Sequence, residues 1–397
     1  MTQLERLQRQ GIRRLGSRES GFRFIAAGGK PVRNGVLERI HELKLPPAWS
    51  DVFVSPHPGR KLQAVGRDRA GRWQYRYHPS YRRRQENAKY RRLLRFAEAL
   101  PALRAAVDRD LRRRGLPREK VLALAVHLLA TAFMRPGSQQ YADRNQSYGV
   151  ATLKAKHVEV EGDAVRFDYT GKSGKRQIRE VKDARVARIV RELLAVPGPG
   201  LLKYVNGDGQ VVDVRRRHIN QYLRETMAGP FTAKDFRTWA GTLICACELA
   251  RHAAAVVPGR TDTRRMVTAA VKATAEKLGN TPAVCRSSYI VPAVIEQFSR
   301  GEVVGVYFRR VEELARQQGL HGSEEALLGL LAARLTLRPE RAAHATRPSR
   351  RRGGTLPGRR SPWRSPGRRS SARSTSPTRP APPCGRPSTS AASPGAS

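Results

Sequence analysis

The chain has 397 residues, enough for two domains, and carries a formal net charge of +43, with 76 lysines and arginines against 33 acidic residues. Four cysteines are too few for a disulfide framework at this length, no run approaches membrane-spanning length, and the first residues lack an apolar secretion signal. These totals predict an intracellular protein, and the charge indicates a polyanionic partner, usually nucleic acid.

The positive charge is spread along the whole chain. Residues 338–397 contain fourteen arginines and one acidic residue, Glu340, for a charge of +13, which leaves +30 on residues 1–337. This last segment is rich in Arg, Ser, Pro and Gly, has almost nothing to bury, and is predicted to be disordered. It could be a nonspecific DNA-binding tail or an uninformative extension of a GC-rich reading frame, and the second interpretation is favoured. Biased codon usage also explains part of the arginine content elsewhere.

The N-terminal part shows strand and turn signals. Residues 1–20 are polar and basic and predict a mobile arm or a short helix. Residues 21–84 predict a small, mainly β domain, and its clearest unit is a hairpin in which 62–65 and 72–77 flank a turn at 68–71.

Helical periods dominate residues 85–337 and predict a larger, mainly α domain. The expected helices cover residues 90–100, 121–133, 184–194, 218–227, 233–251, 263–278, 282–300 and 324–335. Between residues 152 and 181, alternating apolar positions around a turn predict a β-hairpin excursion. The predicted fold class is therefore α+β.

The stretch at residues 278–289 has the strongest local signals. Gly279 is expected to end one helix, Thr281 to cap the next, and Pro282 to be its first residue. Asn280 lies at the turn, and Tyr289 can project into a cleft. Tyr289 is either a core aromatic with a satisfied hydroxyl, which is the commoner case, or a nucleophile if cations converge on it.

Several basic residues of the helical region are candidates for cations that lie close to Tyr289. Arg135 precedes a proline, which pushes its side chain away from the helix surface. Lys172 lies in the Gly-Lys-Ser-Gly loop at the tip of the hairpin excursion. Lys234 and Arg237 are three residues apart near the start of a helix, hence on one face. Each alone could be a solvated charge, and the loop lacks Walker A spacing.

The cysteines offer a further candidate site. Cys245 and Cys247 lie near His252, but within a helix the two thiols point in different directions. Reduced structural thiols are favoured over a metal site.

Taken together, six stretches in order along the chain resemble the type IB DNA topoisomerases, specifically the poxvirus-like and bacterial branch. They are residues 46–52, 71–79, 147–153, 171–174, 231–242 and 278–286. The resemblance covers roughly residues 20–310 and excludes the tail. It implies the catalytic fold that these enzymes share with the tyrosine recombinases.

The resemblance also implies roles for individual residues. Tyr289 would be the nucleophile, Arg135 and Arg237 the clamp on the scissile phosphate, Lys172 the general acid, and Asn280 a donor to a nonbridging oxygen. Two positions depart from the pattern. Poxviral enzymes have histidine where Asn280 stands, and the residue after Arg135 is usually a larger aliphatic one.

Further residues are expected to contact DNA: Gln74, Tyr75 and Tyr77 in the N-terminal domain, and Tyr141 and Lys234 in the larger domain. On a regular strand Gln74 faces away from both tyrosines, which could also be ordinary half-buried strand aromatics. The expected partner is double-stranded DNA, held by a monomer that acts as a clamp. No membrane, metal or other cofactor is expected, and the predicted location is the bacterial cytoplasm, at the nucleoid.

The chemistry of these residue types agrees with the resemblance. Attack on a phosphodiester builds negative charge on equatorial oxygens, and fixed arginines and other donors stabilise it. The predicted function is relaxation of supercoiled DNA through a 3′-phosphotyrosine intermediate, strand rotation and religation, without ATP. Two alternatives stay open: a tyrosine recombinase, and a basic DNA-binding protein without catalytic activity.

Overall fold

A computed structural model describes residues 1–254, 262–308, 313 and 318–337. All of them belong to one unit, Met1–Arg341. The predicted disordered tail, residues 338–397, lies outside the described residues. None of the described helices combines the length and the apolar composition that crossing a bilayer requires.

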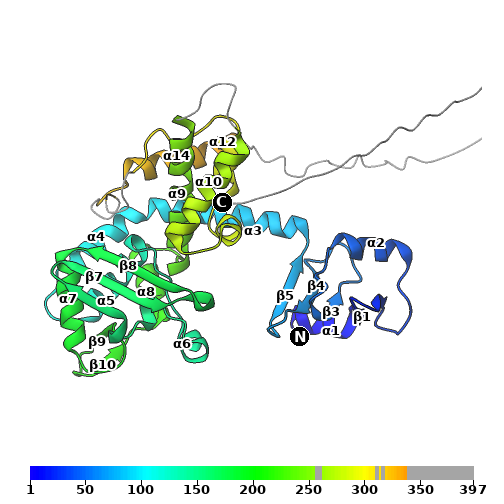
Figure 1. Cartoon of the computed structure of the whole chain (residues 1–397), viewed down its shortest axis with the longest axis horizontal. Helices are drawn as coiled ribbons and strands as arrows, with labels where there is room; N and C mark the ends of the chain where they lie inside the picture. Colours follow the sequence, from blue (N-terminus) through cyan, green and yellow to red (C-terminus); the bar gives the residue numbers. More distant parts are fainter. Residues whose placement is uncertain (255–261, 309–312, 314–317, 338–397) are drawn as a thin grey trace, which may run out of the picture. The chain divides into compact units, whose positions relative to one another are not determined.

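The N-terminal part is built on one antiparallel sheet (Figure 1). Its elements are α1 (Gln3–Gln10), β1 (Ile12–Ser17), β2 (Gly21–Ile25), α2 (Asn34–Glu42), β3 (Ser50–Val54), β4 (Leu62–Arg67) and β5 (Trp73–Tyr77). The strand order is β2-β1-β3-β4-β5, so β5 is an edge strand. The predicted hairpin is present as β4 and β5, with Val65 opposite Tyr75.

Within residues 1–20, the predicted short helix is present as α1, whereas Ile12–Ser17 form strand β1 of the sheet, so the prediction of a separate arm was wrong. Ile12 of β1 pairs with Val54 of β3, and both side chains are buried in the same core. Leu7 of α1 packs with Val65. Because most residues around Ile12 are basic or polar, the sequence gives no clear strand signal there. The strand conformation is instead stabilised by pairing with a strand that is distant in the sequence.

The larger part is mainly helical, as predicted. Its elements are α3 (Pro79–Glu98), α4 (Leu100–Leu111), α5 (Arg118–Thr131), α6 (Gln139–Asn145), β6 (Val158–Glu161), β7 (Ala164–Thr170), β8 (Arg176–Lys182), α7 (Ala184–Ala195), β9 (Lys203–Val205), β10 (Val211–Asp213), α8 (Arg216–Thr226), α9 (Ala233–Ala254), α10 (Thr263–Leu278), α11 (Pro282–Ser288), α12 (Pro292–Phe298) and α14 (Gly322–Leu337). Helix α3 runs across the expected domain boundary at residues 84 and 85. The fold class is α+β, as the sequence predicts.

Two central helices organise the core of this part. In α5 the apolar residues from Val121 to Leu129 are buried on all sides, which is typical of a helix inside a core. Helix α9 packs against α3, α5, α10, α12 and α14. Its first turn is fixed by Asp235, whose carboxylate accepts the Thr232 N–H at 2.8 Å and pairs with Arg92 at 2.5 Å.

The hairpin excursion forms a three-stranded antiparallel sheet, in the order β6-β7-β8, with α7 packed on it (Figure 1). Val165, Phe167 and Tyr169 of β7 face the core. Opposite them on β8, Gln177 pairs with Tyr169 and Arg179 with Phe167. The core-facing side of β8 therefore contains an arginine.

Candidate active site

The segment that carries Tyr289 lies between two short helices. Gly279 ends α10 with a left-handed backbone (φ +62°), and the Thr281 hydroxyl caps α11 by accepting the Val284 N–H at 3.4 Å. The predicted continuous helix over residues 282–300 was wrong, because α11 ends at Ser288 and Pro292 begins α12. Pro292 has no N–H and forces the preceding residue, Val291, into an extended conformation. The helix therefore cannot continue through the segment that follows Tyr289.

Helix α9 fixes the backbone of Tyr289. The Thr242 hydroxyl accepts the Val291 N–H at 3.3 Å and shares its proton between the carbonyl oxygens of Thr238 at 2.8 Å and Tyr289 at 3.1 Å. Gly241 is the reason for this close approach, because a Cβ at that position would lie 2.9 Å from both the Cβ and the carbonyl oxygen of Tyr289. The half-buried ring is therefore held at one place against α9.

Arg237 lies against that ring. Its side chain is buried, and its Cζ is 5.0 Å from the Tyr289 ring centroid. Its Nη2 donates to the Leu278 carbonyl oxygen at 2.8 Å, and its Nη1 donates to the Phe133 carbonyl oxygen. Burial, followed by the charge of Arg135, lowers the pKa of Arg237 to about 10. The described contacts orient this charge through neutral carbonyl groups and leave it without a carboxylate partner.

Arg135 and Asn280 form the neighbouring part of the cluster. Arg135 donates through Nη2 to the Gly279 carbonyl oxygen at 3.2 Å and to the Asn280 Oδ1. The Asn280 Nδ2 and the Arg237 Nε are then buried without a hydrogen-bond acceptor among the described residues. A buried polar group without a partner costs about 1–3 kcal/mol, so these donors indicate a site built for a ligand with acceptor oxygens.

The electrostatics distinguish Tyr289 from the neighbouring Tyr169. Burial raises its pKa, but Arg237, Arg135 and Lys172 outweigh that effect, and the net direction is downward. Tyr169, which faces the same arginines, has a raised pKa because burial dominates there. A lowered phenol pKa increases the fraction of phenolate, which is the nucleophilic form.

Lys172 approaches the site from the tip of the sheet. It begins a short 3₁₀ turn, Lys172–Gly174, between β7 and β8, and its side chain is exposed. Its charge is close enough to contribute to the lowered pKa of Tyr289. All five residues predicted to be catalytic, Arg135, Lys172, Arg237, Asn280 and Tyr289, therefore converge on one region.

The residues expected to contact DNA lie at exposed positions, except Gln74, which is partly buried. Tyr75 and Tyr77 of β5 are about 40% exposed, and their rings stack with centroids 6.1 Å apart. Gln74 points to the opposite face, where its Nε2 donates to Asp68 at 2.8 Å. Tyr141 and Lys234 are exposed. Tyr75 and Tyr77 therefore share the exposed face of the edge strand β5.

Two cations near the cluster were missed by the sequence prediction. Lys89 of α3 donates to the Ser288 carbonyl oxygen at 2.5 Å, directly before the tyrosine. Arg179 of β8 lies beside Gly279, since a Cβ on that glycine would be 2.9 Å from the Arg179 Nη2. The alternation of β8 could have identified Arg179 from the sequence. Arg179 lies on the same side of the strand as the buried Gln177 and Val181, whereas Ile178 is exposed.

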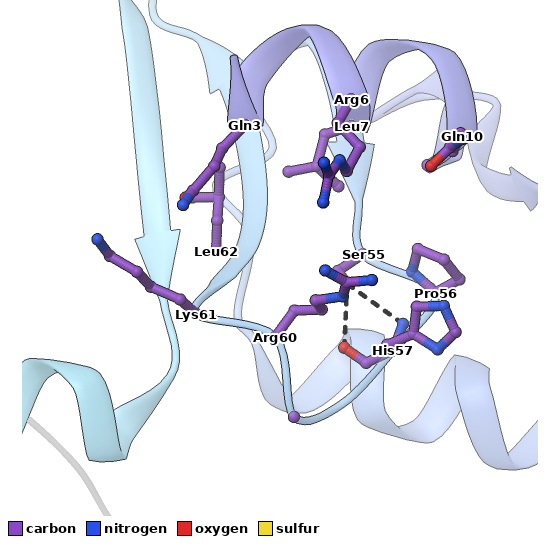
Figure 2. A pocket seen from close by; sticks show the side chains of 12 residues that line it. Gln3, Arg6, Leu7, Gln10, Ser55, Pro56, His57, Arg60, Lys61 and Leu62 are labelled. Carbon is purple, nitrogen blue, oxygen red and sulfur yellow. Dashed lines mark hydrogen bonds between the residues drawn. The ribbon is translucent and has the colours of Figure 1, made fainter. Parts of the chain in front are cut away.

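A cavity of about 480 Å³ lies elsewhere, between α1 and the β3–β4 connection (Figure 2). Arg6, Arg60 and Lys61 are among its lining residues, and the Ser55 hydroxyl folds the loop by donating to the His57 carbonyl oxygen at 3.0 Å. Its lining includes none of the five converging residues, so it is separate from the candidate active site.

Comparisons with known proteins match both parts of the chain. A family model described as eukaryotic DNA topoisomerase I, catalytic core, matches residues 78–301, and one described as bacterial DNA topoisomerase IB, N-terminal domain, matches residues 21–68. DNA topoisomerase 1B of Acanthamoeba polyphaga mimivirus is 30% identical over 294 residues, which cover 73% of this chain and 88% of the viral protein. DNA topoisomerase I of monkeypox virus is 21% identical over 268 residues, 66% of this chain and 82% of that protein.

Among solved structures, the XerH site-specific recombinase bound to a palindromic difH substrate is 17% identical to this chain. The match covers 48% of this chain and 47% of the recombinase, with a TM-score of 0.30. A superposition this limited carries no argument about the fold or the activity.

Proposed function

This chain belongs to the type IB DNA topoisomerase family, and from that premise we propose that Tyr289 is the nucleophile that cleaves one DNA strand. The protein is an enzyme of the isomerase class that changes DNA topology. The proposal concerns which residues carry out the reaction and how. It is supported above all by the Arg237 guanidinium that lies over the Tyr289 ring, beside buried N–H donors that have no acceptor within the described part of the chain.

In the proposed cleavage step, the Tyr289 phenolate oxygen attacks the scissile phosphorus. A bond forms between that oxygen and phosphorus, and the bond from phosphorus to the 5′-oxygen breaks. Arg135, Arg237 and Asn280 stabilise the charge on the nonbridging oxygens, because guanidinium and amide N–H groups match phosphate oxygens. Lys172 gives a proton to the departing 5′-oxygen, a contribution typically worth about 10²–10⁴-fold in rate.

The product of cleavage is a 3′-phosphotyrosine and a free 5′-hydroxyl. The ester to Tyr289 keeps the energy of the broken phosphodiester, so religation needs no ATP and no metal. While the strand is open, the free end rotates and supercoils of either sign relax. The 5′-hydroxyl then attacks the phosphotyrosine, and Tyr289 leaves.

The proposed partner is duplex DNA, bound by a monomer that closes around it. Tyr75 and Tyr77 are exposed on one face of β5, which suits contact with bases or sugars in a groove. Gln74, Tyr141 and Lys234 are proposed as further contacts. The match of residues 21–68 to a bacterial domain supports action on the chromosome in the bacterial cytoplasm.

Replacing Tyr289 with phenylalanine tests the proposal. Tyr289→Phe removes a single hydroxyl, so we expect it to abolish relaxation of supercoiled plasmid while binding duplex DNA almost as well as the wild type. Relaxation is measured by gel electrophoresis in EDTA without ATP, and binding by fluorescence anisotropy. Relaxation by the variant would mean that another residue is the nucleophile.

The same assay separates the two alternatives. A tyrosine recombinase needs paired sites, whereas relaxation of a plasmid without such sites indicates a topoisomerase. A DNA-binding protein without catalytic activity would shift the plasmid in a gel and leave its linking number unchanged.

A further inference from the structure

A third arginine lies beside the two that the family pattern assigns to the site. Arg179 is on β8, on the side of the strand that faces the core, opposite Phe167. An arginine here is unusual, because its neighbours across the sheet, Val165, Phe167 and Tyr169, are buried and largely apolar. A charge placed among them needs a compensating partner.

The described contacts of Arg179 do not neutralise its charge. Its Nη1 donates to the Ile178 carbonyl oxygen at 2.9 Å and its Nη2 to the Gln177 Oε1 at 3.2 Å, and both acceptors are neutral. Its Nε is buried and has no acceptor among the described residues. Arg179 therefore has a free donor and an uncompensated charge.

The Arg179 guanidinium adjoins the candidate active site. A Cβ on Gly279 would lie 2.5 Å from the Gln177 Oε1 and 2.9 Å from the Arg179 Nη2, so both side chains touch the turn that carries Asn280. Arg135 donates to the carbonyl oxygen of the same glycine. The pKa of Arg179 is lowered, first by burial and also by Arg135, which places the two guanidinium groups near each other. Like charges gather here in the absence of DNA, and an anion would relieve their repulsion.

Resting on the cleavage chemistry proposed above, we propose that Arg179 is a further phosphate-binding residue of the active site, which binds a backbone phosphate of the cleaved strand. That phosphate is the scissile one or an immediate neighbour. In either case the phosphate would accept the Nε–H that has no acceptor within the described residues, and its charge would compensate that of the guanidinium.

The experiment compares Arg179→Met with Arg176→Met in single-turnover cleavage of a duplex with one cleavage site. Arg176 is a matched control, because it lies on the same strand, faces outward, and is already paired with Asp168 at 2.9 Å. We expect Arg179→Met to slow cleavage about tenfold or more, in keeping with loss of one fixed donor, and Arg176→Met to have little effect. Equal rates for the two variants would overturn the proposal.

A second series locates the phosphate. The scissile phosphate and each neighbour are replaced, one at a time, by an uncharged methylphosphonate. At the position that Arg179 binds, the difference between wild type and Arg179→Met should largely vanish, because no anionic oxygen remains to be bound. A difference that persists at every position would mean that Arg179 has only a structural role, and would overturn the proposal.

Arg179→Lys guards against misfolding of the methionine variant. It keeps the positive charge but loses the planar fork, so we expect a cleavage rate between those of the wild type and Arg179→Met. If Arg179→Met fails to fold, the lysine variant is measured on the same substrate series against the same criteria. The Arg179 variants change the rate of cleavage, whereas Tyr289→Phe is expected to abolish it. A wrong assignment of Arg179 is therefore distinguishable from a wrong assignment of the nucleophile.

Discussion

At the scale of single residues, the proposed cleavage step requires a phenol that ionises near neutral pH. A free tyrosine has a pKa near 10, so about one molecule in a thousand is ionised at pH 7. Burial of the Tyr289 ring works against ionisation, and Arg237, Arg135 and Lys172 reverse that effect.

The lowered pKa of Tyr289 predicts the pH dependence of cleavage. Single-turnover cleavage should rise with pH as the phenolate forms and level off below the pKa of free tyrosine. Arg135→Gln removes one cation, so the Tyr289 pKa should rise and the midpoint of the profile should move to higher pH, in addition to an overall loss of rate. A slower variant with an unchanged midpoint would show that Arg135 does not act on the phenol.

The role proposed for Lys172, protonation of the leaving oxygen, can be tested separately by changing the leaving group. Lys172→Ala should cleave an ordinary duplex slowly, because the 5′-oxygen leaves poorly without a proton. On a duplex with sulfur in place of that oxygen, the variant should approach the wild-type rate, since a thiolate needs no proton. Measurement of both rates on both substrates tests this, and absence of rescue would point to another acid, with Lys234 the next candidate.

At the scale of elements, the position of Tyr289, the proposed nucleophile, depends on how closely α9 and the Tyr289 segment approach. Gly241 permits this contact, and Thr242 adds a hydrogen bond from the next residue. The chain is free to turn at Tyr289 because α11 ends there and Pro292 starts α12. Packing against α9 then decides where the phenol lies.

Gly241→Ala should therefore displace Tyr289, since its new Cβ would lie 2.9 Å from Tyr289 atoms. We expect a lower melting temperature and a cleavage rate reduced much more than DNA affinity. The control is Gly329→Ala in α14, where a Cβ meets no atom within 4 Å and should stabilise the helix by up to about 1 kcal/mol. Thermal melting and single-turnover cleavage compare the two variants. Wild-type cleavage by Gly241→Ala would refute the role given to this contact.

At the scale of the whole molecule, positive charge dominates. Residues 1–337 carry a charge of +30. Contacts between these residues and DNA phosphates should therefore make DNA affinity fall steeply with salt even when residues 338–397 are absent. The five converging residues also lie within this part. Residues 338–397 add a further charge of +13.

Deletion of residues 338–397 should leave the single-turnover cleavage rate at saturating enzyme unchanged. It should weaken DNA binding mainly at low salt, because the removed arginines act through nonspecific charge. Cleavage rates and binding isotherms at several salt concentrations measure both effects. Loss of cleavage by the truncated protein would contradict the interpretation of the tail as dispensable.

Local sequence signals determined much of this protein. Gly279, Thr281 and Pro282 fix the turn before Tyr289, because a left-handed glycine, a capping hydroxyl and a proline at the first helical position act over a few residues. The β4–β5 hairpin was predictable for the same reason. The ordered motifs also indicated the family, which the comparisons confirm.

Tertiary structure alone decided the rest. Which donors remain without an acceptor beside Tyr289, and that Arg179 and Lys89 belong to its surroundings, depend on contacts between segments far apart in the chain. The place of β1 in the sheet likewise depends on pairing with β3. Propensity and periodicity describe a residue's own neighbourhood, whereas burial and the meeting of distant charges exist only once the core has packed.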